Sequence, residues 1–494
     1  MSLIKVTDLT FAYDGSYDNI FEHVSFQLDT NWKLGFTGRN GRGKTTFLHL
    51  LLGKYEYGGT ISTDVDFDYF PYQVEHKEHH TIDIVAEIVL DFEHWQLLRE
   101  LSLLKVSEDV LYRPFASLSN GEQTKVLLAA LFLKENHFLL IDEPTNHLDV
   151  HARKLVSDYL KSKRGFILVS HDRAFLDNCV DHILSINKTD IDIQRGNFTD
   201  WWENKQRQDN REMAENEKLK KDIKRLSEAA KRTSNWSDEV EQTKNGTRNS
   251  GSKVDKGYIG HKAAKMMKRS KSIEQRQQSA IEDRSQLLKN IESSDSLKIA
   301  QLTYHKHQLV ELDRVSIHYG DKQVCRDVSF AIEQGDRIAL AGPNGSGKSS
   351  LLKLICGEDI PYSGALRIGS QLSISYVSQD TSHLRGSLSD FARSGGIDES
   401  LFKAILRKLD FSRLQFEKDI ASYSGGQKKK VLIAKSLCDR THLHVWDEPL
   451  NFIDVISRMQ IEELLLEHAP TILFVEHDSE FCKHIATKAV ELSG

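Results

Sequence analysis

The hydrophobic positions near both ends of the chain predict β-strands. Apolar and polar side chains alternate along residues 1–15, as in a strand with one buried face. Continuous apolar runs at 138–141 and 471–475 have the length of buried strands. No run approaches the 18 or more apolar residues of a membrane helix, so the pattern predicts none. The first residues also lack a basic segment followed by an apolar core, and we expect no secretory signal and a cytoplasmic location.

Residues 201–290 follow a helical period instead. Their apolar side chains predict two helices that share a thin apolar seam, and they lie at Leu219, Ile223, Leu226, Ala230, Met266, Ile273, Ile281 and Leu288. Residues 235–260 hold four glycines among polar residues, which predicts an irregular tip. We therefore expect an antiparallel helical hairpin whose first helix extends about 50 Å, with Trp201 and Trp202 packing its base onto the preceding domain.

Length and composition indicate a multidomain protein. A chain of 494 residues exceeds what one core supports, and 39% hydrophobic residues suffice for ordinary α/β cores. We expect domains at 1–200 and 306–494, joined by a linker at 201–305. The five cysteines are scattered without a C-x-x-C pair, which argues against zinc, iron–sulfur and disulfide frameworks and predicts small buried thiols.

Positive charge is concentrated in the hairpin. Residues 201–290 hold 22 Lys and Arg against 14 Asp and Glu, a net charge of +8. Since the whole chain carries −6, the remainder carries −14. A charge run of this kind is either a solvated helix face or a surface for a polyanion.

Two phosphate-binding loops identify the chemistry. The segments GRNGRGKT at 38–45 and GPNGSGKS at 342–349 both fit G-x-x-x-x-G-K-[ST]. The glycines let backbone N–H groups turn around phosphates, Lys44 and Lys348 reach the β- and γ-phosphates, and Thr45 and Ser349 offer hydroxyls to Mg²⁺.

Each loop is followed by the same series of motifs, so the chain is an internal duplication. The first series is Gln73, LSNGEQ at 118–123, FLLIDEP at 138–144, NHLD at 146–149 and SHD at 170–172. The second is Gln379, YSGGQ at 423–427, LHVWDEP at 443–449, NFID at 451–454 and EHD at 476–478. Loop and signature serine are 81 residues apart in the first half and 82 in the second.

This doubled series resembles the ATP-binding cassette superfamily across about four-fifths of the chain. The resemblance implies an α/β fold with two tandem P-loop nucleotide-binding domains, here called the first and second cassettes, and no transmembrane domain. Two cassettes joined by a long charged hairpin, with the basic run HKAAKMMKRSK at 261–271, resemble the ABC-F class of ribosome-associated ATPases. Only 46 residues separate Gln73 from Ser119, and 46 follow Glu448, which leaves little room for an inserted arm or a C-terminal extension. These features resemble the antibiotic-resistance branch, and within it the Lsa-type ribosome protection proteins.

The resemblance implies two composite sites for ATP and Mg²⁺, each built from the P-loop of one cassette and the signature turn of the other. The first site would combine Tyr13, Gly38, Asn40, Gly41, Gly43, Lys44, Thr45, Thr46 and Gln73 with Ser424, Gly425, Gly426 and Gln427. The second would combine Tyr319, Gly342, Asn344, Gly345, Gly347, Lys348, Ser349, Ser350 and Gln379 with Ser119, Gly121 and Gln123. Asn120 stands where the pattern has glycine, and asparagine tolerates a positive φ better than most residues.

The catalytic roles follow from the same motifs. Thr45, Gln73 and Asp142 would bind Mg²⁺ in one cassette, and Ser349, Gln379 and Asp447 in the other. Glu143 and Glu448 would polarise the attacking water, while His171 and His477 would sense the γ-phosphate. Either glutamate could instead be structural. Tyr13 and Tyr319 would stack on adenine, although an aromatic residue after a first strand is often part of the core.

The partners implied are the 70S ribosome, its 23S rRNA and peptidyl-tRNA, with no membrane, and a monomer whose two cassettes pair within the chain. Phosphate contacts would come from basic residues of the linker, namely Lys244, Arg248, Lys253, Lys256, Lys262, Lys265, Lys268, Arg269 and Lys271. The implied activity is relief of inhibition by lincosamides, pleuromutilins and streptogramin A, with the protein bound at the ribosomal exit site.

Two other functions fit part of the pattern. A tandem ATPase subunit of an importer also carries two cassettes without membrane helices, but it has no use for a basic hairpin. A DNA-repair cassette ATPase interrupts the cassette itself with very long coiled coils or zinc modules, whereas here the insertion lies between cassettes.

Overall fold

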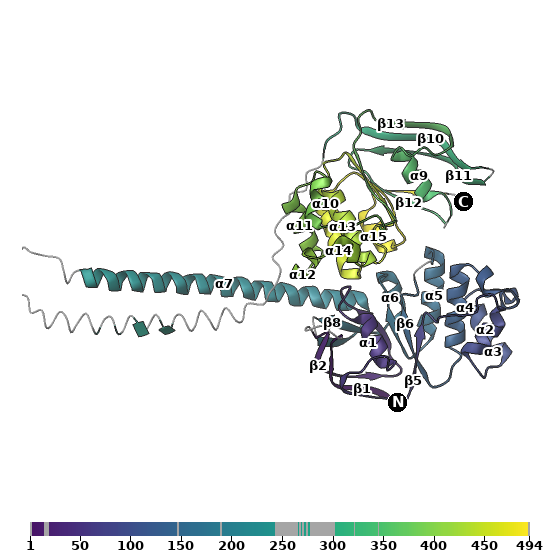
Figure 1. Ribbon diagram of the computed structural model, residues 1–494, viewed down its shortest axis with the longest axis horizontal. Coiled ribbons are helices and arrows are strands. Elements are labelled where there is room, and N and C mark those ends of the chain that lie inside the picture. Colours follow the sequence, from purple (N-terminus) through teal and green to yellow (C-terminus); the bar gives the residue numbers. More distant parts are fainter. Residues whose placement is uncertain are drawn as a thin grey trace, which may run out of the picture. The chain divides into compact units, whose positions relative to one another are not determined.

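The computed structural model divides into two compact units, one formed by Met1–Trp201 with Ser296–Gly494 and the other by Trp202–Asp295. It describes residues 2–13, 19–145, 148–187, 190–242, 265, 268, 271–272, 275–276, 302–320, 322–343 and 345–492. Both cassettes, which Figure 1 shows, belong to the first unit.

Each cassette contains a small antiparallel sheet and a larger, mainly parallel sheet. In the first cassette the antiparallel order is β2-β1-β4 and the larger order is β5-β6-β7-β3-β8-β9, in which β9 is antiparallel to β8. The strands are β1 (Leu3–Phe11), β2 (Phe21–Asp29), β3 (Lys33–Thr37), β4 (Gly58–Ser62), β5 (Asp66–Phe70), β6 (His137–Asp142), β7 (Phe166–Val169), β8 (His182–Asn187) and β9 (Asp190–Arg195).

The second cassette repeats this plan. Its sheets have the orders β11-β10-β13 and β14-β15-β16-β12-β17. The strands are β10 (Gln308–Tyr319), β11 (Lys322–Glu333), β12 (Arg337–Ala341), β13 (Tyr362–Ile368), β14 (Ile374–Val377), β15 (Leu443–Asp447), β16 (Ile472–Val475) and β17 (Lys488–Glu491). The apolar runs expected to form buried strands become β6 and β16, which lie between neighbours in their sheets, and their interior residues are fully covered.

Helices follow the parallel strands and carry the motif residues at their starts. In the first cassette they are α1 (Lys44–Leu51), α2 (Thr81–Ile88), α3 (His94–Leu103), α4 (Asn120–Leu131), α5 (Val150–Ser162) and α6 (Arg173–Cys179), with short 3₁₀ turns η1 (Glu108–Tyr112) and η2 (Phe115–Ser117). In the second they are α9 (Lys348–Ile355), α10 (Leu388–Ser394), α11 (Glu399–Lys408), α12 (Arg413–Phe416), α13 (Gly425–Cys438), α14 (Val455–His468) and α15 (Ser479–Ile485), with η3 (Ile420–Ser422). Ligands collect beyond the carboxyl ends of parallel strands in such sheets.

One part of the core of each cassette lies between its two sheets. Phe47 and Leu48 of α1 are fully buried against residues of β1, β2 and β6, and Leu351 and Leu352 of α9 play the same part in the second cassette. Tyr304 is also buried in this core and donates to Ser370 O, so the second cassette begins a little before residue 306. All five cysteines are free thiols, three buried and two half-buried, as expected.

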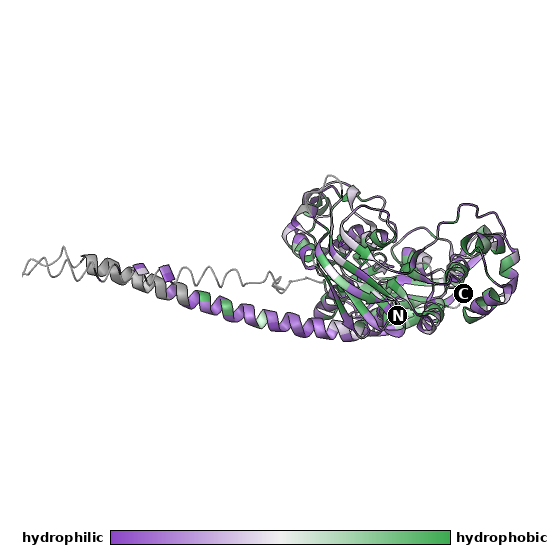
Figure 2. Ribbon diagram, turned by 90° about the horizontal axis from the view of Figure 1, so that it is seen from below, coloured by the Kyte–Doolittle hydropathy of each residue, from purple (hydrophilic) through white to green (hydrophobic). Residues whose placement is uncertain are grey.

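The second unit contains the helix α7 (Phe198–Gln242), which starts in the first unit and is 45 residues long. It continues through residues 235–242, where the sequence led us to expect the irregular tip. No glycine or proline occurs between Phe198 and Gly246, so no helix-breaking residue interrupts the helix there. Figure 2 shows that the described part of α7 is largely hydrophilic. None of the helices in the described part of the chain is long and apolar enough to cross a membrane.

Trp201 is 4% exposed, and its ring centre lies 5.4 Å from that of Phe198, at the start of α7.

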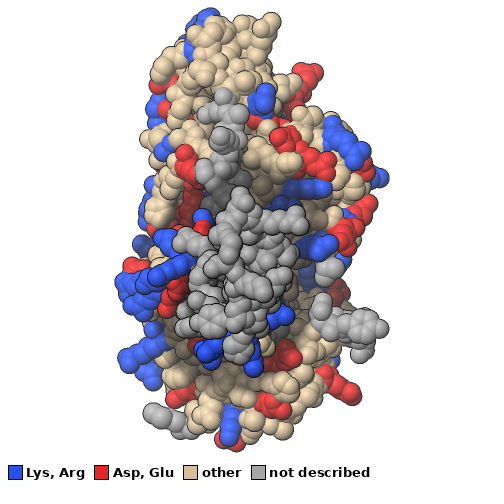
Figure 3. Space-filling view, turned by 90° about the vertical axis from the view of Figure 1, so that its left-hand side faces the viewer, with Lys and Arg blue, Asp and Glu red and all other residues tan. Residues whose placement is uncertain are grey.

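On the face shown in Figure 3, lysine and arginine side chains lie among aspartate and glutamate side chains rather than in one continuous patch. Six of the nine linker residues predicted to contact RNA lie outside the described residues, namely Lys244, Arg248, Lys253, Lys256, Lys262 and Arg269.

Candidate active sites at the two P-loops

Both P-loops connect a central parallel strand to a helix through a glycine with left-handed backbone. Gly43 has φ 91° and Gly347 has φ 81°, and each directly precedes its helix. A Cβ atom at Gly43 would lie 2.4 Å from Ile20 Cγ2, so only glycine fits this turn.

Each P-loop lysine donates hydrogen bonds to backbone oxygens of its own loop. Lys44 Nζ donates to Gly38 O over 2.7 Å, and Lys348 Nζ donates to Gly342 O over 2.9 Å. Burial lowers the pKa of both lysines. The cradle expected from the sequence is therefore formed in both cassettes. Asn344 lies outside the described residues.

In both cassettes the hydroxyl of the P-loop lies next to the aspartate of the D-E-P motif. Thr45 Oγ1 donates to Asp142 Oδ2 over 2.9 Å, and Ser349 Oγ donates to Asp447 Oδ1 over 3.1 Å. A hydroxyl and a carboxylate are the hard oxygen ligands that Mg²⁺ prefers, so the residues present fit this ion.

A tyrosine that the sequence reasoning missed joins each aspartate. Tyr69 OH donates to Asp142 Oδ2 over 2.9 Å, and Tyr376 OH donates to Asp447 Oδ2 over 3.5 Å. Burial and the neighbouring carboxylate raise the pKa of both phenols. The available signal was positional, because the two tyrosines lie four and three residues before Gln73 and Gln379.

The two Q-loop glutamines differ in what they contact. Gln379 Nε2 donates to Glu448 Oε2 over 2.8 Å. Gln73 is exposed and, among the described residues, makes no hydrogen bond to Asp142 or Glu143. The first cassette has one more residue between its tyrosine and its glutamine, which displaces Gln73 relative to the strand.

Each D-E-P glutamate pairs with the histidine of its own cassette. His171 Nε2 lies 3.3 Å from Glu143 Oε1, and His477 Nε2 lies 3.4 Å from Glu448 Oε1. Glu143 and Glu448 both have left-handed backbone, at φ 52° and 46°. Strained backbone at the same motif residue in both cassettes is typical of a functional site.

The electrostatic surroundings of the glutamates differ. Burial, and then the charge of Asp142, raises the pKa of Glu143 to about 8. A hydrogen bond from His477 lowers the pKa of Glu448 despite its burial, and Asn451 Nδ2 adds a second bond of 2.6 Å to this carboxylate. Burial lowers the pKa of His171 well below its usual value.

The tyrosines expected to stack on adenine lie at the surface. Tyr13 is 42% exposed and Tyr319 is 48% exposed, so neither ring is a core residue. Tyr13 OH and Thr46 Oγ1 are 2.8 Å apart, and Tyr319 OH donates to Ser350 Oγ over 3.2 Å. Each ring is thus fixed beside the start of its P-loop helix.

The first composite site is closed. A cavity of about 430 Å³ is lined by Asn40, Gly41 and Glu143 of the first cassette and by Ser424, Gly425 and Gly426 of the second. Asn40 Nδ2 donates to Phe452 O across the boundary over 2.6 Å. The expected meeting of the first P-loop with the second signature turn is present.

The second composite site is not assembled in the same way. A cavity of about 590 Å³ is lined by Lys348, Ser349, Gln379, Glu448 and His477 and, among the described residues of the first cassette, by Leu148 and Arg153 alone. The predicted contributors Ser119, Gly121 and Gln123 do not line it.

The polar groups of the first signature turn are used within that turn instead. Ser119 Oγ donates to the Glu122 carboxylate over 2.8 Å and also accepts from Glu122 N–H. Gln123 Nε2 donates to the backbone oxygens of Phe115 and Leu118.

The tolerance of asparagine for a positive φ is not used at Asn120. Asn120 and its counterpart Gly425 are the first residues of α4 and α13, where the backbone is helical, and neither has a positive φ. The close approach occurs one residue later, since a Cβ atom at Gly426 would lie 2.2 Å from Phe452 O.

Comparisons with known proteins agree with this geometry. The family model described as ABC transporter matches residues 21–146 and 325–451. The chain is 28% identical to the ATP-binding protein Uup of Caulobacter vibrioides, over 96% of this chain and 75% of the relative. It is 27% identical to the ribosome protection protein VmlR of Bacillus subtilis, over 99% and 86%. It is 26% identical to the energy-dependent translational throttle protein EttA of Escherichia coli, over 96% and 89%.

Solved structures share the fold. The archaeal ribosome recycling factor aABCE1, solved with the ribosomal stalk protein aP1, aligns with a TM-score of 0.63 and 19% identity, over 99% of this chain and 87% of that one. A structure titled RNase-L Inhibitor aligns with a TM-score of 0.62 over 99% and 88%. The duplicated P-loops, the paired carboxylates and the matched family model together show that the chain belongs to the ABC transporter family of ATP-binding proteins, as an ABC-type ATPase related to the ABC-F proteins.

Proposed function

We propose that this chain is an ATP-dependent ribosome protection factor that relieves inhibition by antibiotics of the peptidyl transferase centre. The drug classes are lincosamides, pleuromutilins and streptogramin A. In this proposal the protein binds the exit site of the 70S ribosome from the cytoplasm and contacts 23S rRNA and peptidyl-tRNA through its linker.

The observation that carries the proposal is the full-length similarity to VmlR, whose name gives it as a ribosome protection protein. The match covers 99% of this chain, so it includes the linker as well as both cassettes. EttA, similar over 96% of the chain, is named for an action on translation.

The linker helix supports the same function. At 1.5 Å per residue, the 45 residues of α7 extend about 68 Å, more than the 50 Å expected from the sequence. Lys265, Lys268 and Lys271 are helical and exposed, with the spacing of one helix face. Exposed ammonium groups at this spacing suit the phosphates of RNA better than a protein partner.

Turnover would be governed by the residues of the two sites. Lys44 and Lys348 bind the phosphates, Glu143 and Glu448 orient water, and the signature turns complete each site when the cassettes close. Mg²⁺, held by Thr45 with Asp142 and by Ser349 with Asp447, would neutralise charge on the transferred phosphoryl group. Closure requires no second chain, because the first P-loop already meets the second signature turn within the monomer.

Co-sedimentation with 70S ribosomes tests binding. We expect the chain to pellet with ribosomes in ATP and to stay in the supernatant in ADP, with the ATP-dependent fraction falling steeply as salt rises. The matched control is the Lys44→Ala/Lys348→Ala variant, which should not pellet in either nucleotide. Equal sedimentation in ATP and ADP, or capture by membrane vesicles in place of ribosomes, would exclude the proposal.

Cell-free translation tests protection. The wild-type chain should restore synthesis in the presence of a lincosamide, a pleuromutilin or streptogramin A, and the lysine variant should not. Ribosome binding without any restoration would limit the function to translation control.

A further inference from the structure

Ion pairs across the cassette boundary connect the first P-loop to the second cassette. Arg39 Nη1 lies 2.8 Å from Asp410 Oδ1, and Arg42 Nη2 lies 3.9 Å from Asp410 Oδ2. Both arginines flank Asn40 and Gly41, which line the first ATP cavity. The Arg39 and Asp410 side chains are only 25% and 23% exposed, so the pair is screened less than an ordinary surface pair.

The duplicated sequence shows that the second P-loop cannot form this pair. Pro343 and Ser346 stand at the positions of Arg39 and Arg42 in the second loop. Lys105 stands at the position of Asp410, since each has left-handed backbone and lies two residues after the end of the corresponding helix, α3 or α11. The charges are therefore complementary at the first ATP site and absent or of the wrong sign at the second.

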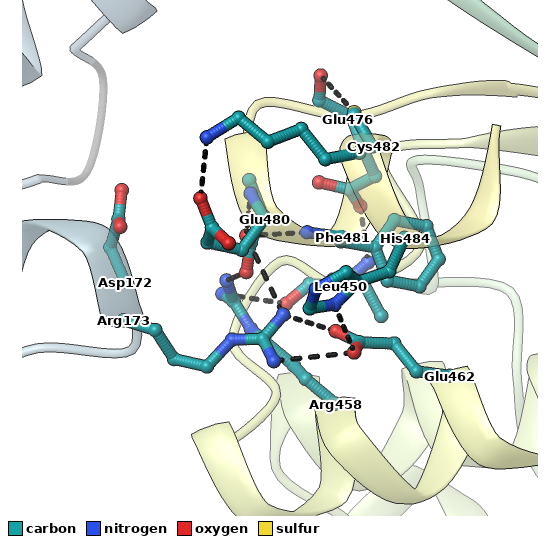
Figure 4. Close-up of polar contacts among 12 residues, drawn as sticks. Asp172, Arg173, Leu450, Arg458, Glu462, Glu476, Glu480, Phe481, Cys482 and His484 are labelled. Carbon is teal, nitrogen blue, oxygen red and sulfur yellow. Dashed lines mark hydrogen bonds and ion pairs between the residues drawn. The ribbon is translucent and has the colours of Figure 1, made fainter. Parts of the chain in front are cut away.

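A second cross-boundary pair lies between α6 and α14, as Figure 4 shows. The Arg173 guanidinium reaches both carboxylate oxygens of Glu462, with Nη1 3.2 Å from Oε2, and its Nη2 is 3.9 Å from Asp478 Oδ1. The side chains of Arg173 and Glu462 are only 7% and 8% exposed. A two-point guanidinium–carboxylate contact of this kind is strong and geometrically specific.

The equivalent positions, with the roles of the two cassettes exchanged, cannot form this pair. Ser479 stands at the position of Arg173, two residues after the second switch histidine. Ser157 stands at the position of Glu462, because the two residues lie eight positions after Asp149 and Asp454, which end the NHLD and NFID motifs. Two serines cannot form an ion pair, so both charged contacts run from the first cassette's nucleotide-binding loops to the second cassette.

We propose that the two ATP sites are unequal, because Arg39–Asp410 and Arg173–Glu462 hold the site of Lys44 and Ser424 closed while the site of Lys348 opens and closes. These four are positioning residues for the ATPase reaction. Opening the first site separates Arg39 from Asp410 and Arg173 from Glu462, so both charged contacts across the boundary are lost. Opening the second site separates neither ion pair and instead breaks the neutral-acceptor hydrogen bond that Arg153 Nη1 donates to His477 O over 3.3 Å. The inference concerns the ATPase alone and does not depend on the ribosomal function proposed above.

Nucleotide release from the full-length chain tests this. The chain is loaded with a fluorescent ATP analogue and Mg²⁺, then chased with excess ATP while fluorescence is followed. We expect two phases of equal amplitude. The Lys44→Ala variant should lack the slow phase and Lys348→Ala the fast phase, which assigns each phase to its site.

Breaking the pairs should then act on one phase only. Asp410→Asn combined with Glu462→Gln should speed the slow phase at least about tenfold and leave the fast phase within about twofold. The matched control is Lys105→Gln, the equivalent position of the first cassette, which should change neither phase. Asp410→Glu keeps the charge and should keep the slow phase.

The experiment still decides the question if the double variant does not fold. If Glu462→Gln, at a buried position, lowers the amount of nucleotide bound per chain, the single variant Asp410→Asn must still speed the slow phase, because Asp410 is less buried than Glu462. A single release phase in the wild type would overturn the proposal. An unchanged slow phase in Asp410→Asn, or an equal effect from Lys105→Gln, would overturn it too.

Discussion

Asn40 Nδ2 donates a hydrogen bond to Phe452 O over 2.6 Å, which connects the first P-loop to the NFID motif of the second cassette. Phe452 has left-handed backbone at φ 63°, and its oxygen also lies against Gly426 of the signature turn. Three motifs that are distant in sequence thus meet at one carbonyl group.

This contact predicts a difference between two adjacent glycines. In Gly426→Ala the new methyl group would lie 2.2 Å from Phe452 O, so the signature turn must move away from the first P-loop. We expect the steady-state ATPase rate to fall by about 100-fold, since displacements of about 1 Å cost this much. In the control Gly425→Ala the nearest contact is an ordinary 3.6 Å, and the loss should be much smaller. Equal losses would contradict the geometry.

Replacing Glu143 and Glu448 together with glutamine should trap the closed state. Glutamine keeps the shape of the side chain but cannot polarise water as a carboxylate does. Phosphate release should become undetectable while ATP still binds, and expression should slow growth because the chain remains on ribosomes. Hydrolysis at the wild-type rate by the double variant would show that these glutamates are not catalytic.

Lys44 and Ser424 should behave as one unit. Ser424 lines the same cavity as the first P-loop, so Ser424→Arg places a long cation where the cassettes meet. The Ser424→Arg/Lys44→Ala double variant should have the ATPase rate of the worse single variant. A double variant markedly slower than both singles would place the two residues in different sites. Ser119→Arg, combined with Lys44→Ala, serves as the comparison and should add to its effect.

The tyrosines beside Asp142 and Asp447, the two aspartates proposed to bind Mg²⁺, should matter unequally. Tyr69 OH is 2.9 Å from Asp142, and Tyr376 OH is 3.5 Å from Asp447. Tyr69→Phe removes a bond that orients the carboxylate, and we expect the Mg²⁺ concentration for half-maximal ATPase to rise about tenfold. Tyr376→Phe should raise it less, because the bond lost is weaker. A Mg²⁺ titration in which neither variant differs from wild type would assign the phenols a purely packing role.

Shortening the linker separates its reach from the ATPase. Replacing residues 243–260 with a Gly-Ser turn leaves α7 and both ATP sites in place, so basal ATPase and ATP-dependent sedimentation should persist while drug protection is lost. Alanine at Lys262, Lys265, Lys268 and Arg269 should instead weaken sedimentation and flatten its salt dependence. Full protection by the shortened chain would mean that the linker is only a spacer.

Much of each site was predictable from the sequence, because its residues lie at fixed offsets within one cassette. The meeting of Thr45 with Asp142, and of His171 with Glu143, follows from motifs at the carboxyl ends of parallel strands in one sheet. The phenols near these aspartates were missed because a tyrosine within a strand carries no motif. The end of α7 was misplaced because polar composition was given more weight than the absence of a helix breaker before Gly246.

The sequence by itself therefore determined the duplicated cassettes, the groups proposed for catalysis and the long helix of the linker, all of which depend on local order and short-range spacing. Only the tertiary structure decided how the cassettes pair. It placed Ser424 in the first ATP cavity, left Ser119 outside the second, and brought Arg39 to Asp410 and Arg173 to Glu462. The physical reason is that contacts between side chains hundreds of residues apart depend on how two folded surfaces fit, and no periodicity or motif spacing along the chain records that fit.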